Sequence, residues 1–327
     1  MTQAEEKAKL LVLVGPTAVG KTKLSLELAK RYDCEIISGD SMQVYRGMDI
    51  GTAKASAEER KQIPHHMIDI VDPDYPFSVA EFQAAVKRCI YDIHKRGKLP
   101  FLVGGTGLYI KAVCYDYRFP EGGVDERFRE ALRQYALQHG TEALYRRLQE
   151  TDPVTAARLH PNDQRRIIRA LEIAHVTGTL MSEQLAGQKK QSPYELCIIG
   201  LTMERKLLYK RIEERVDRMI EQGLVEEVRG LLERGYTADL VSMQALGYKE
   251  IAAYLQGRCS LAEAVELLKR NTRRFAKRQL SWFRHMPDIF WIDTGGNANF
   301  SAHCRQINDI IAEKLGLQQE CIDKNAK

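Results

Sequence analysis

The segment with the clearest chemistry is GPTAVGKT at residues 15–22, which fits the phosphate-loop pattern G-x-x-x-x-G-K-[ST]. It follows a short apolar run, 10–14, and opens a segment with helical spacing, 21–31. Glycines permit backbone angles that let the loop's N–H groups point at anionic oxygens, and a helix N-terminus adds partial positive charge. Lys21 adds a full charge, and Thr22 can coordinate Mg²⁺. The segment therefore predicts a site for a di- or triphosphate.

A carboxylate follows the next apolar run along the chain. Asp40 comes just after residues 35–38, which we expect to form a second strand. Because the carboxyl ends of parallel strands meet at one edge of a sheet, Asp40 is expected in the same crevice as the phosphate loop. There it could hold a metal or accept a proton from a nucleophile, although an Asp at such a place can also cap a helix N-terminus. The crevice position favours a functional role.

A second acid is missing where enzymes that transfer phosphoryl groups usually carry one. These enzymes commonly place an Asp after another apolar strand to hold Mg²⁺. The candidate strand, 99–103, is followed instead by Gly104, Gly105 and Thr106. This counts against a standard ATPase, whereas small-molecule kinases tolerate variation at this place.

Strand, glycine turn and helix alternate over the first 120 residues, which is typical of a parallel sheet covered by helices. The elements expected there are strands 10–14, 35–38, 67–71 and 99–103 and helices 21–31 and 78–96. The next stretch is expected to hold helices only, at 125–139, 141–150, 153–160 and 163–177. The last part is expected to hold strands 196–201 and 289–292 and helices 205–234, 244–254, 261–284 and 302–315.

These elements predict an α/β fold with a P-loop NTPase-like parallel sheet flanked by helices. Residues 1–120 and 195–327 are expected to form the catalytic core, and residues 121–194 an all-helical insertion. With 44% hydrophobic and 28% charged residues and no run of 18 apolar residues, the chain is expected to be a globular protein without a membrane span. Its seven cysteines are scattered without a C-x-x-C, which disfavours a disulfide framework or a zinc site and fits the reducing cytoplasm. Nothing implies an obligate protein partner, and we expect a monomer.

A dense basic segment lies near the C-terminus. Residues 269–284 contain seven basic residues and no acid. On a helix, pairs of them recur every four residues and make one cationic stripe: Lys269 and Arg270, Arg273 and Arg274, Lys277 and Arg278. Phe275, Trp282 and Phe283 lie between them and are expected to anchor the other face in the core. The stripe suits a nucleic-acid backbone, and a solvated surface is the structural alternative.

Several motifs in this order resemble the bacterial tRNA dimethylallyltransferases, also called the bacterial tRNA isopentenyltransferase family. They are GPTAVGKT, SGDSMQVYRGMDIGTAK at 38–54, HHMID at 65–69, GGTGLYIKA at 104–112, NDQRRIIRALE at 162–172, MQALGYKE at 243–250 and KRNTRRFAKRQLSWFR at 269–284. The resemblance runs from about residue 10 to about residue 294. The phosphate loop alone is shared by many families, but its combination with GDSMQVY and LGYKE is specific.

The resemblance implies the reaction and its partners. A member of this family transfers the dimethylallyl group from dimethylallyl diphosphate to the N6 amine of the adenosine 3′ to the anticodon in tRNA, with Mg²⁺, and releases pyrophosphate. It implies Asp40 as the general base, with Lys21, Thr22 and Arg215 acting on the departing pyrophosphate and Thr22 on the metal. The donor pyrophosphate is expected to lie against Gly15, Pro16, Thr17, Ala18, Val19, Gly20, Lys21 and Thr22. A salt bridge to Glu213 or Glu214 is the structural alternative for Arg215.

The resemblance also implies a set of tRNA contacts. The target adenosine is expected to leave its stack and lie against Asp40, Ser41, Met42 and Gln43, with Thr106 close by. The remaining expected contacts are Arg127, Gln164, Arg165, Arg166, Ile167 and Ile168 in the insertion and Arg273, Arg274, Lys277 and Arg278 in the basic segment. Thr106 could equally be a helix N-cap, and 164–168 a solvated basic helix face.

Two other functions remain open on the residues alone. A P-loop kinase of a small metabolite or nucleoside would share the loop and Asp40, but does not explain the basic segment. A non-catalytic RNA-binding P-loop protein would bind tRNA without forming a product. The C-terminal tail lacks the zinc-finger ligands of eukaryotic relatives, so the chain resembles the bacterial type. The insertion and the basic segment argue against the related branch that prenylates free adenine nucleotides.

Overall fold

The computed structural model describes residues 7–119, 123–188, 191–295 and 300–317. They form two compact units, Met1–Cys114 with Ser192–Lys327, and Tyr115–Gln191. The sequence predicts 121–194 for the insertion, and the second unit begins earlier than that. The side-chain amide of Gln188 accepts a hydrogen bond from the backbone N–H of Arg118 at 2.9 Å and donates one to its carbonyl at 2.7 Å. The entering segment is thereby held within the second unit.

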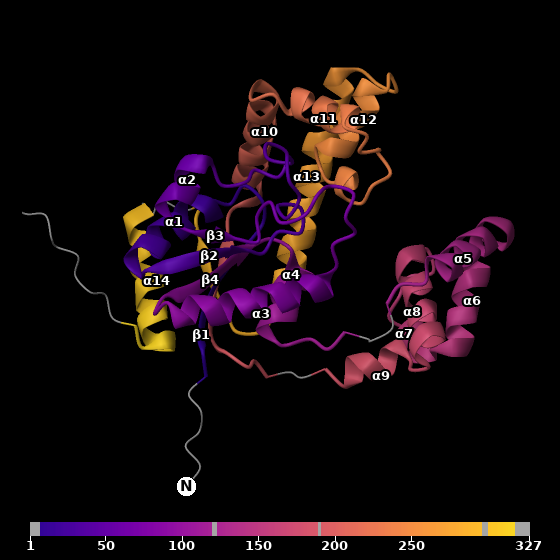
Figure 1. The fold of residues 1–327 in the computed structure, drawn as a ribbon, viewed down its shortest axis with the longest axis horizontal. Helices are drawn as coiled ribbons and strands as arrows, with labels where there is room; N and C mark the ends of the chain where they lie inside the picture. Colours follow the sequence, from indigo (N-terminus) through magenta and orange to yellow (C-terminus); the bar gives the residue numbers. More distant parts are fainter. Residues whose placement is uncertain (1–6, 120–122, 189–190, 296–299, 318–327) are drawn as a thin grey trace, which may run out of the picture. The chain divides into compact units, whose positions relative to one another are not determined.

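The first unit is built on a six-stranded parallel sheet, as predicted, with the order β3-β2-β4-β1-β5-β6 (Figure 1). The strands are β1 (Lys9–Val14), β2 (Cys34–Ser38), β3 (His65–His66), β4 (Leu99–Gly104), β5 (Glu195–Thr202) and β6 (Ile289–Asp293). Strands β1, β4 and β2 are neighbours, and Val14 pairs with Gly104 while Ser38 pairs with Val103. The segments that follow these three strands therefore leave the same edge of the sheet side by side.

Helices cover both faces of the sheet. Those of this unit are α1 (Lys21–Arg31), α2 (Ala57–Gln62), α3 (Val79–Lys95), α4 (Gly107–Cys114), α10 (Arg205–Glu221), α11 (Leu224–Glu233), α12 (Tyr248–Leu255), α13 (Leu261–Arg284) and α14 (Phe300–Leu315). Alternate β1 residues, Leu11 and Leu13, share a core cluster with residues of α1 and α14. Helix α3 lies on the opposite side of the sheet (Figure 1). Because both faces are covered, the strands read as apolar runs.

A second core lies among α10, α11, α12 and α13, which gather at one end of this unit (Figure 1). The segment after β2 joins it through Val44, Tyr45 and Met48, all fully buried or nearly so. In the same segment, the carboxylate of Glu227 on α11 accepts hydrogen bonds from the backbone N–H groups of Asp49 at 2.9 Å and its next two neighbours. This packing fixes the chain that begins at Asp40.

The second unit is all-helical in its described part. Its helices are α5 (Glu126–His139), α6 (Thr141–Thr151), α7 (Pro153–Ala156), α8 (Gln164–Thr177) and α9 (Met181–Ala186). Its core is apolar and includes Leu144 and Leu148 of α6. The buried acid Glu172 is held by Arg129 at 2.8 Å and Arg169 at 2.6 Å, so that its charge is compensated.

Some elements differ from the sequence prediction. The expected strand 67–71 is absent from the described chain, since Met67 and Asp69 have φ of 63° and 56°, and only Val71 makes an isolated bridge, to Tyr45. The expected helix 205–234 divides into α10 and α11 at Gly223, whose φ is 97°. Helix α12 begins later than the predicted residue 244 because the chain is extended at residue 245.

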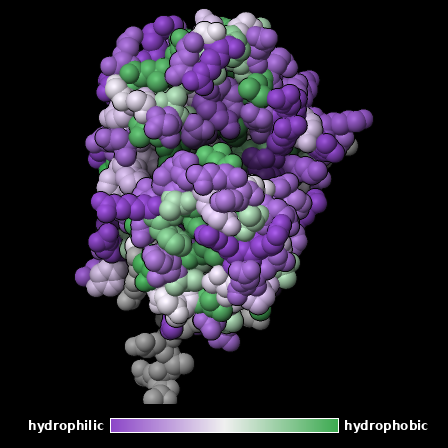
Figure 2. Space-filling model, turned by 90° about the vertical axis from the view of Figure 1, so that its right-hand side faces the viewer, coloured by the Kyte–Doolittle hydropathy of each residue, from purple (hydrophilic) through white to green (hydrophobic). Residues whose placement is uncertain are grey.

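Two predicted boundaries shift further, and three short helices were not predicted. The expected helix 153–160 ends at Ala156, after which Arg158 and Leu159 make i→i−3 turn hydrogen bonds. The sequence reading also omitted α2, α4 and α9. In the described ranges, no helix is both long and apolar enough to cross a membrane. Figure 2 shows a face on which hydrophilic residues predominate and hydrophobic ones lie in scattered patches.

Candidate active site

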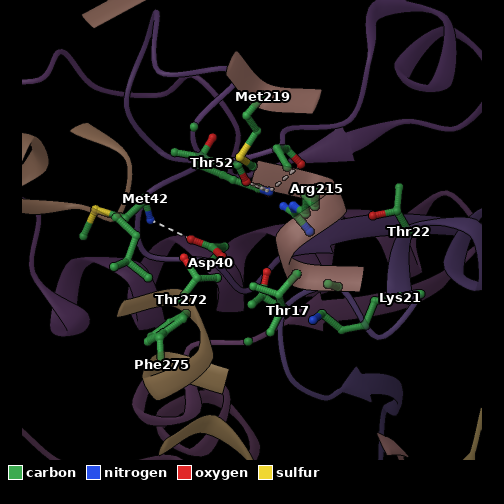
Figure 3. A pocket seen from close by; sticks show the side chains of 18 of the residues that line it. Thr17, Lys21, Thr22, Asp40, Met42, Thr52, Arg215, Met219, Thr272 and Phe275 are labelled. Atoms are coloured by element: carbon green, nitrogen blue, oxygen red, sulfur yellow. Dashed lines mark hydrogen bonds between the residues drawn. The ribbon is translucent and has the colours of Figure 1, made fainter. Parts of the chain in front are cut away.

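A cavity of about 1090 Å³ lies in the first unit and is lined by the segments that follow β1, β2 and β4 together with α1, α10 and α13. Figure 3 shows Lys21, Asp40 and Arg215 around it, each from a different element. The fold therefore brings together the phosphate loop, the predicted base and the predicted active-site arginine. Arg215 comes from a part of the chain far from Lys21 and Asp40. On its apolar side the cavity is lined by Met219, Leu268 and Phe275, among others.

The phosphate loop makes a tight turn at the end of β1. Gly15 has a φ of 152°, and a Cβ there would lie 2.8 Å from the Leu201 carbonyl oxygen, so only glycine fits. Five of the eight predicted donor residues line the cavity: Thr17, Ala18, Gly20, Lys21 and Thr22. Gly15, Pro16 and Val19 do not line it and are buried. These three buried residues therefore support the loop and do not contact a ligand in the cavity with their side chains.

Lys21 is held over the loop that precedes it. Its Nζ donates hydrogen bonds to the carbonyls of Gly15 at 2.9 Å and Pro16 at 2.8 Å. Burial, with a smaller effect of the Arg215 charge, lowers the pKa of Lys21 from 10.5 to about 7, and Asp40 opposes the shift. A lysine with this pKa gains strongly from an anion that restores its charge.

One backbone N–H of the loop does not point at an anion site, which corrects the sequence prediction. The N–H of Thr17 donates to the side-chain Oε1 of Gln279 on α13, at 2.9 Å. Thr17 still lines the cavity (Figure 3), so its hydroxyl is the group that can reach a ligand.

Asp40 closes a short turn rather than capping a helix. Its Oδ1 accepts a hydrogen bond from the backbone N–H of Met42 at 2.9 Å, and residues 41–47 form turns, bends and one isolated bridge, without a helix. The helix-cap alternative is therefore wrong. Burial raises the pKa of Asp40 above its ordinary value, although the Met42 N–H and the charges of Lys21 and Arg215 act against it. A partly buried carboxylate of raised pKa suits a general base.

Arg215 faces the cavity from α10. The structural alternative for it is wrong: Glu213 pairs with Arg273 at 2.6 Å and Glu214 with Lys210 at 4.0 Å. Within the described ranges, Arg215 has no carboxylate within 4.0 Å. Burial lowers the pKa of its guanidinium, while the charge of Asp40 raises it. Lys21 and Arg215 thus place two cations near the Asp40 carboxylate in this cavity, an arrangement that favours a polyanionic ligand.

The segment after β4 supports the turn that carries Asp40. The Thr106 hydroxyl accepts a hydrogen bond from the Ser41 N–H at 3.0 Å and donates one to the Ser41 Oγ at 3.3 Å. Thr106 directly precedes α4, but its side chain bonds Ser41. The side chain of Gln43 accepts from Ser38 Oγ at 2.7 Å and donates to the Thr52 carbonyl at 3.2 Å. Ser41, Met42, Gln43 and Thr106 all line the cavity.

Some basic residues of helix α13 form ion pairs with α10, and the others are exposed. Lys269 and Arg273 pair with acids of α10, Asp217 at 2.7 Å and Glu213 at 2.6 Å. The exposed basic residues of the helix are Arg270, Arg274, Lys277, Arg278 and Arg284, and Arg278 also lines the cavity. Of the three aromatic residues expected in the core, only Phe283 is buried, since Phe275 lines the cavity and Trp282 is 39% exposed.

In the second unit, the predicted tRNA contacts differ in exposure. Ile167 and Ile168 are buried in the core of this unit, so their side chains are not available to RNA. Arg127 on α5 and Arg165 and Arg166 on α8 are exposed, and Arg166 pairs with Asp163 at 3.3 Å. Gln164, at the first turn of α8, is partly exposed.

Sequence reasoning missed Gln279. Its side chain is only 6% exposed and contacts both the phosphate loop and the end of β4. The helical spacing of the segment could have indicated that Gln279 is buried. Gln279 shares one helix face with Ala276 and Phe283, which are both apolar. A polar residue on a buried face must find hydrogen-bond partners.

The chain matches two family models, "IPP transferase" over residues 43–286 and "Isopentenyl transferase" over residues 8–69. It is 54% identical to a tRNA dimethylallyltransferase of Geobacillus thermodenitrificans over 310 residues, 95% of this chain and 98% of that protein. A tRNA dimethylallyltransferase of Bacillus mycoides is 55% identical over 302 residues, covering 92% of this chain and 95% of that one.

Solved structures agree with these matches. The tRNA isopentenylpyrophosphate transferase of Bacillus halodurans is 51% identical, with a TM-score of 0.72 over 95% of this chain and 97% of that one. A eukaryotic dimethylallyltransferase acting on tRNA is 31% identical, with a TM-score of 0.80 over 96% of this chain and 81% of that one. The resemblance seen in the sequence is confirmed, and the chain belongs to the IPP transferase family, the family of the tRNA dimethylallyltransferases.

Proposed function

We propose that this chain transfers the dimethylallyl group from dimethylallyl diphosphate to the N6 amine of the adenosine 3′ to the anticodon in tRNA, and releases pyrophosphate. The observation that carries the proposal is a single cavity that joins a phosphate loop, a partly buried carboxylate and a partly buried arginine. The printed names of the relatives support the same reaction. We further propose that the enzyme is cytoplasmic and acts as a monomer.

The reaction needs a base on one side of the donor carbon and cations on the other. The N6 amine forms a bond to C1 of the dimethylallyl group, while the bond from C1 to the bridging oxygen breaks and its electron pair leaves with pyrophosphate. The amine proton passes to the Asp40 carboxylate. Lys21 and Arg215 stabilise the negative charge that develops on the leaving group. Both cations and the carboxylate face the same cavity (Figure 3), as this step requires.

Mg²⁺ fits the residues of the loop. Mg²⁺ sites at phosphates use few protein ligands and complete their octahedron with phosphate oxygens and water. The Thr22 hydroxyl, in the first turn of α1 and on the cavity wall, is the protein ligand that we assign to it. In the described part of the chain, no group of three or more His, Cys, Asp or Glu side chains forms an alternative site. The bound ion supplies further positive charge to the departing pyrophosphate.

The tRNA is assigned to surfaces whose exposed basic side chains form no ion pair with another described residue. Arg274, Lys277 and Arg278 of α13 are exposed, and Arg278 reaches the cavity wall. In the second unit, exposed Arg127 and Arg165 are the assigned contacts to the anticodon stem-loop. Ser41 and Met42 line the cavity beside Asp40 and are assigned to the flipped adenine. A small-molecule kinase does not need these basic surfaces.

The test is a mass spectrum of an unmodified anticodon stem-loop RNA after incubation with the protein, Mg²⁺ and dimethylallyl diphosphate. We expect a gain of one dimethylallyl unit, located by fragmentation at the adenosine 3′ to the anticodon. The matched control RNA carries guanosine at this position and should gain nothing. If the adenosine RNA binds but stays unmodified, the proposal is wrong, and ATP turnover would then be measured to test a kinase.

A further inference from the structure

Gln279 joins two segments of the active site from the buried face of α13. Its Oε1 accepts a hydrogen bond from the Thr17 N–H at 2.9 Å, and its Nε2 donates one to the Gly105 carbonyl at 3.0 Å. The side chain is 6% exposed, so water does not replace these partners freely. Both ends of the amide are used, and the two partners fix which end is oxygen.

The two contacts continue into the groups that carry the reaction. Thr17 belongs to the phosphate loop. Gly105 directly precedes Thr106, whose hydroxyl accepts a hydrogen bond from the Ser41 N–H at 3.0 Å. Ser41 follows Asp40 in the turn that the Asp40 carboxylate itself closes. A continuous path of hydrogen bonds and single peptide units therefore runs from the donor loop, through Gln279, to the turn that carries the base.

Gly105 lies close against the amide of Gln279. A Cβ added to Gly105 would lie 2.3 Å from the Gln279 Nε2, so the amide would have to move away from the Gly105 carbonyl. The primary amide accepts from the Thr17 N–H through its oxygen and donates to the Gly105 carbonyl through its nitrogen, without carrying a charge. A carboxylate of the same shape would keep the first hydrogen bond and place an oxygen against the carbonyl oxygen of Gly105.

We propose that Gln279 is a positioning residue for the prenyl transfer, which sets the donor loop at a fixed place relative to the turn of Asp40. This inference rests on the proposed function. Gln279 touches neither reacting atom in this assignment. It holds the Thr17 N–H out of the phosphate cradle and keeps the spacing between the pyrophosphate site and the base. Displacement of either segment by an ångström is costly in such a site.

The first experiment compares Gln279→Met with a matched control, Gln83→Met. Gln83 is another buried glutamine, 7% exposed, whose Nε2 donates to the Ala112 carbonyl at 2.8 Å outside the cavity. We expect Gln279→Met to lower kcat/KM for dimethylallyl diphosphate by about 10- to 100-fold, because the part-buried Thr17 N–H and the buried Gly105 carbonyl lose their partner. The dissociation constant of the anticodon stem-loop should stay within about twofold of the wild-type value.

The control separates positioning from general stability. Both methionine variants should lower the melting temperature to a similar degree, and Gln83→Met should keep the wild-type kcat and donor KM. Unchanged kinetics in a folded Gln279→Met, or an equal kinetic loss in Gln83→Met, would overturn the inference. Wild-type protein in the same assay reports on the proposed function separately, since its failure to form product would reject that function before any variant is compared.

A second pair of variants keeps the test decisive if Gln279→Met does not fold. Gln279→Glu retains the contact to Thr17 and should raise the donor KM and lower kcat at pH 8. Gly105→Ala disturbs the same contact by placing a methyl group against the Gln279 amide, and it should lower kcat/KM to a similar degree. When Gly105→Ala is combined with Gln279→Ala, the clash disappears, so the double variant should lose much less than the product of the two single losses. Independent, multiplicative losses would contradict the proposed link.

Discussion

Donor binding is predicted to require that Lys21 take up a proton at alkaline pH. Burial and the Arg215 charge lower the pKa of Lys21 from 10.5 to about 7, so the side chain loses its charge as the pH rises through about 7. A bound diphosphate favours the charged form and raises this pKa again. Donor affinity should therefore fall as the pH rises above 7, and binding there should consume protons.

The magnitude follows from the titration. With a pKa of about 7, about one-tenth of the molecules carry the Lys21 charge at pH 8 and about one-hundredth at pH 9. The matched variant is Lys21→Arg, whose guanidinium stays charged across this range. The ratio of wild-type to Lys21→Arg affinity should fall about tenfold per pH unit above pH 7.5. This ratio cancels the ionisation of the donor, which is the same in both experiments.

The assay is isothermal titration of dimethylallyl diphosphate with Mg²⁺ at pH 6 to 9, in pairs of buffers that differ in ionisation enthalpy. At pH 8 the wild-type protein should take up about 0.9 proton more than Lys21→Arg. The affinity of the variant will differ from that of the wild type at every pH, because the guanidinium is larger, but this offset does not affect the slope. A pH-independent affinity ratio, with equal proton uptake in both proteins, would refute the reasoning.

Three further predictions concern the base, the RNA surface and the scaffold. Asp40→Asn should lower kcat by about 10²- to 10⁴-fold and leave stem-loop affinity nearly unchanged; activity within a few-fold of the wild type would rule out the base role. Arg274→Gln should weaken stem-loop binding and reduce the slope of log affinity against log salt by about 0.7 to 0.9, measured by fluorescence anisotropy. The ion-paired Arg273→Gln is the matched control, and equal slopes in both variants would contradict the assignment. Glu227→Ala should lower the free energy of unfolding in urea by about 3 kcal/mol, because backbone N–H groups lose their acceptor, whereas the exposed neighbour Glu226→Ala should change it little.

Much of the fold could be predicted because it depends on local patterns. The boundaries 21–31 and 261–284 agree with α1 and α13, and the Ser78 cap with Glu81 is a full capping box. These features involve residues within four positions of one another, and a sequence shows them directly. The two wrong element predictions have local causes too. The helix predicted over 205–234 is interrupted at Gly223, and the strand predicted over 67–71 is prevented by the positive φ of Met67 and Asp69.

The sequence by itself determined the phosphate loop, the parallel α/β class and the family, since these depend on spacing within short motifs and on their order along the chain. Only the tertiary structure decided which partner each polar group takes. In the folded chain Arg215 faces the cavity, whereas Glu213 pairs with Arg273. The Thr17 N–H donates to Gln279, which lies 262 residues away in the sequence. Such pairings depend on how helices pack across the sheet edge, and no local spacing encodes them. The same packing made a single site from segments that are far apart in the chain.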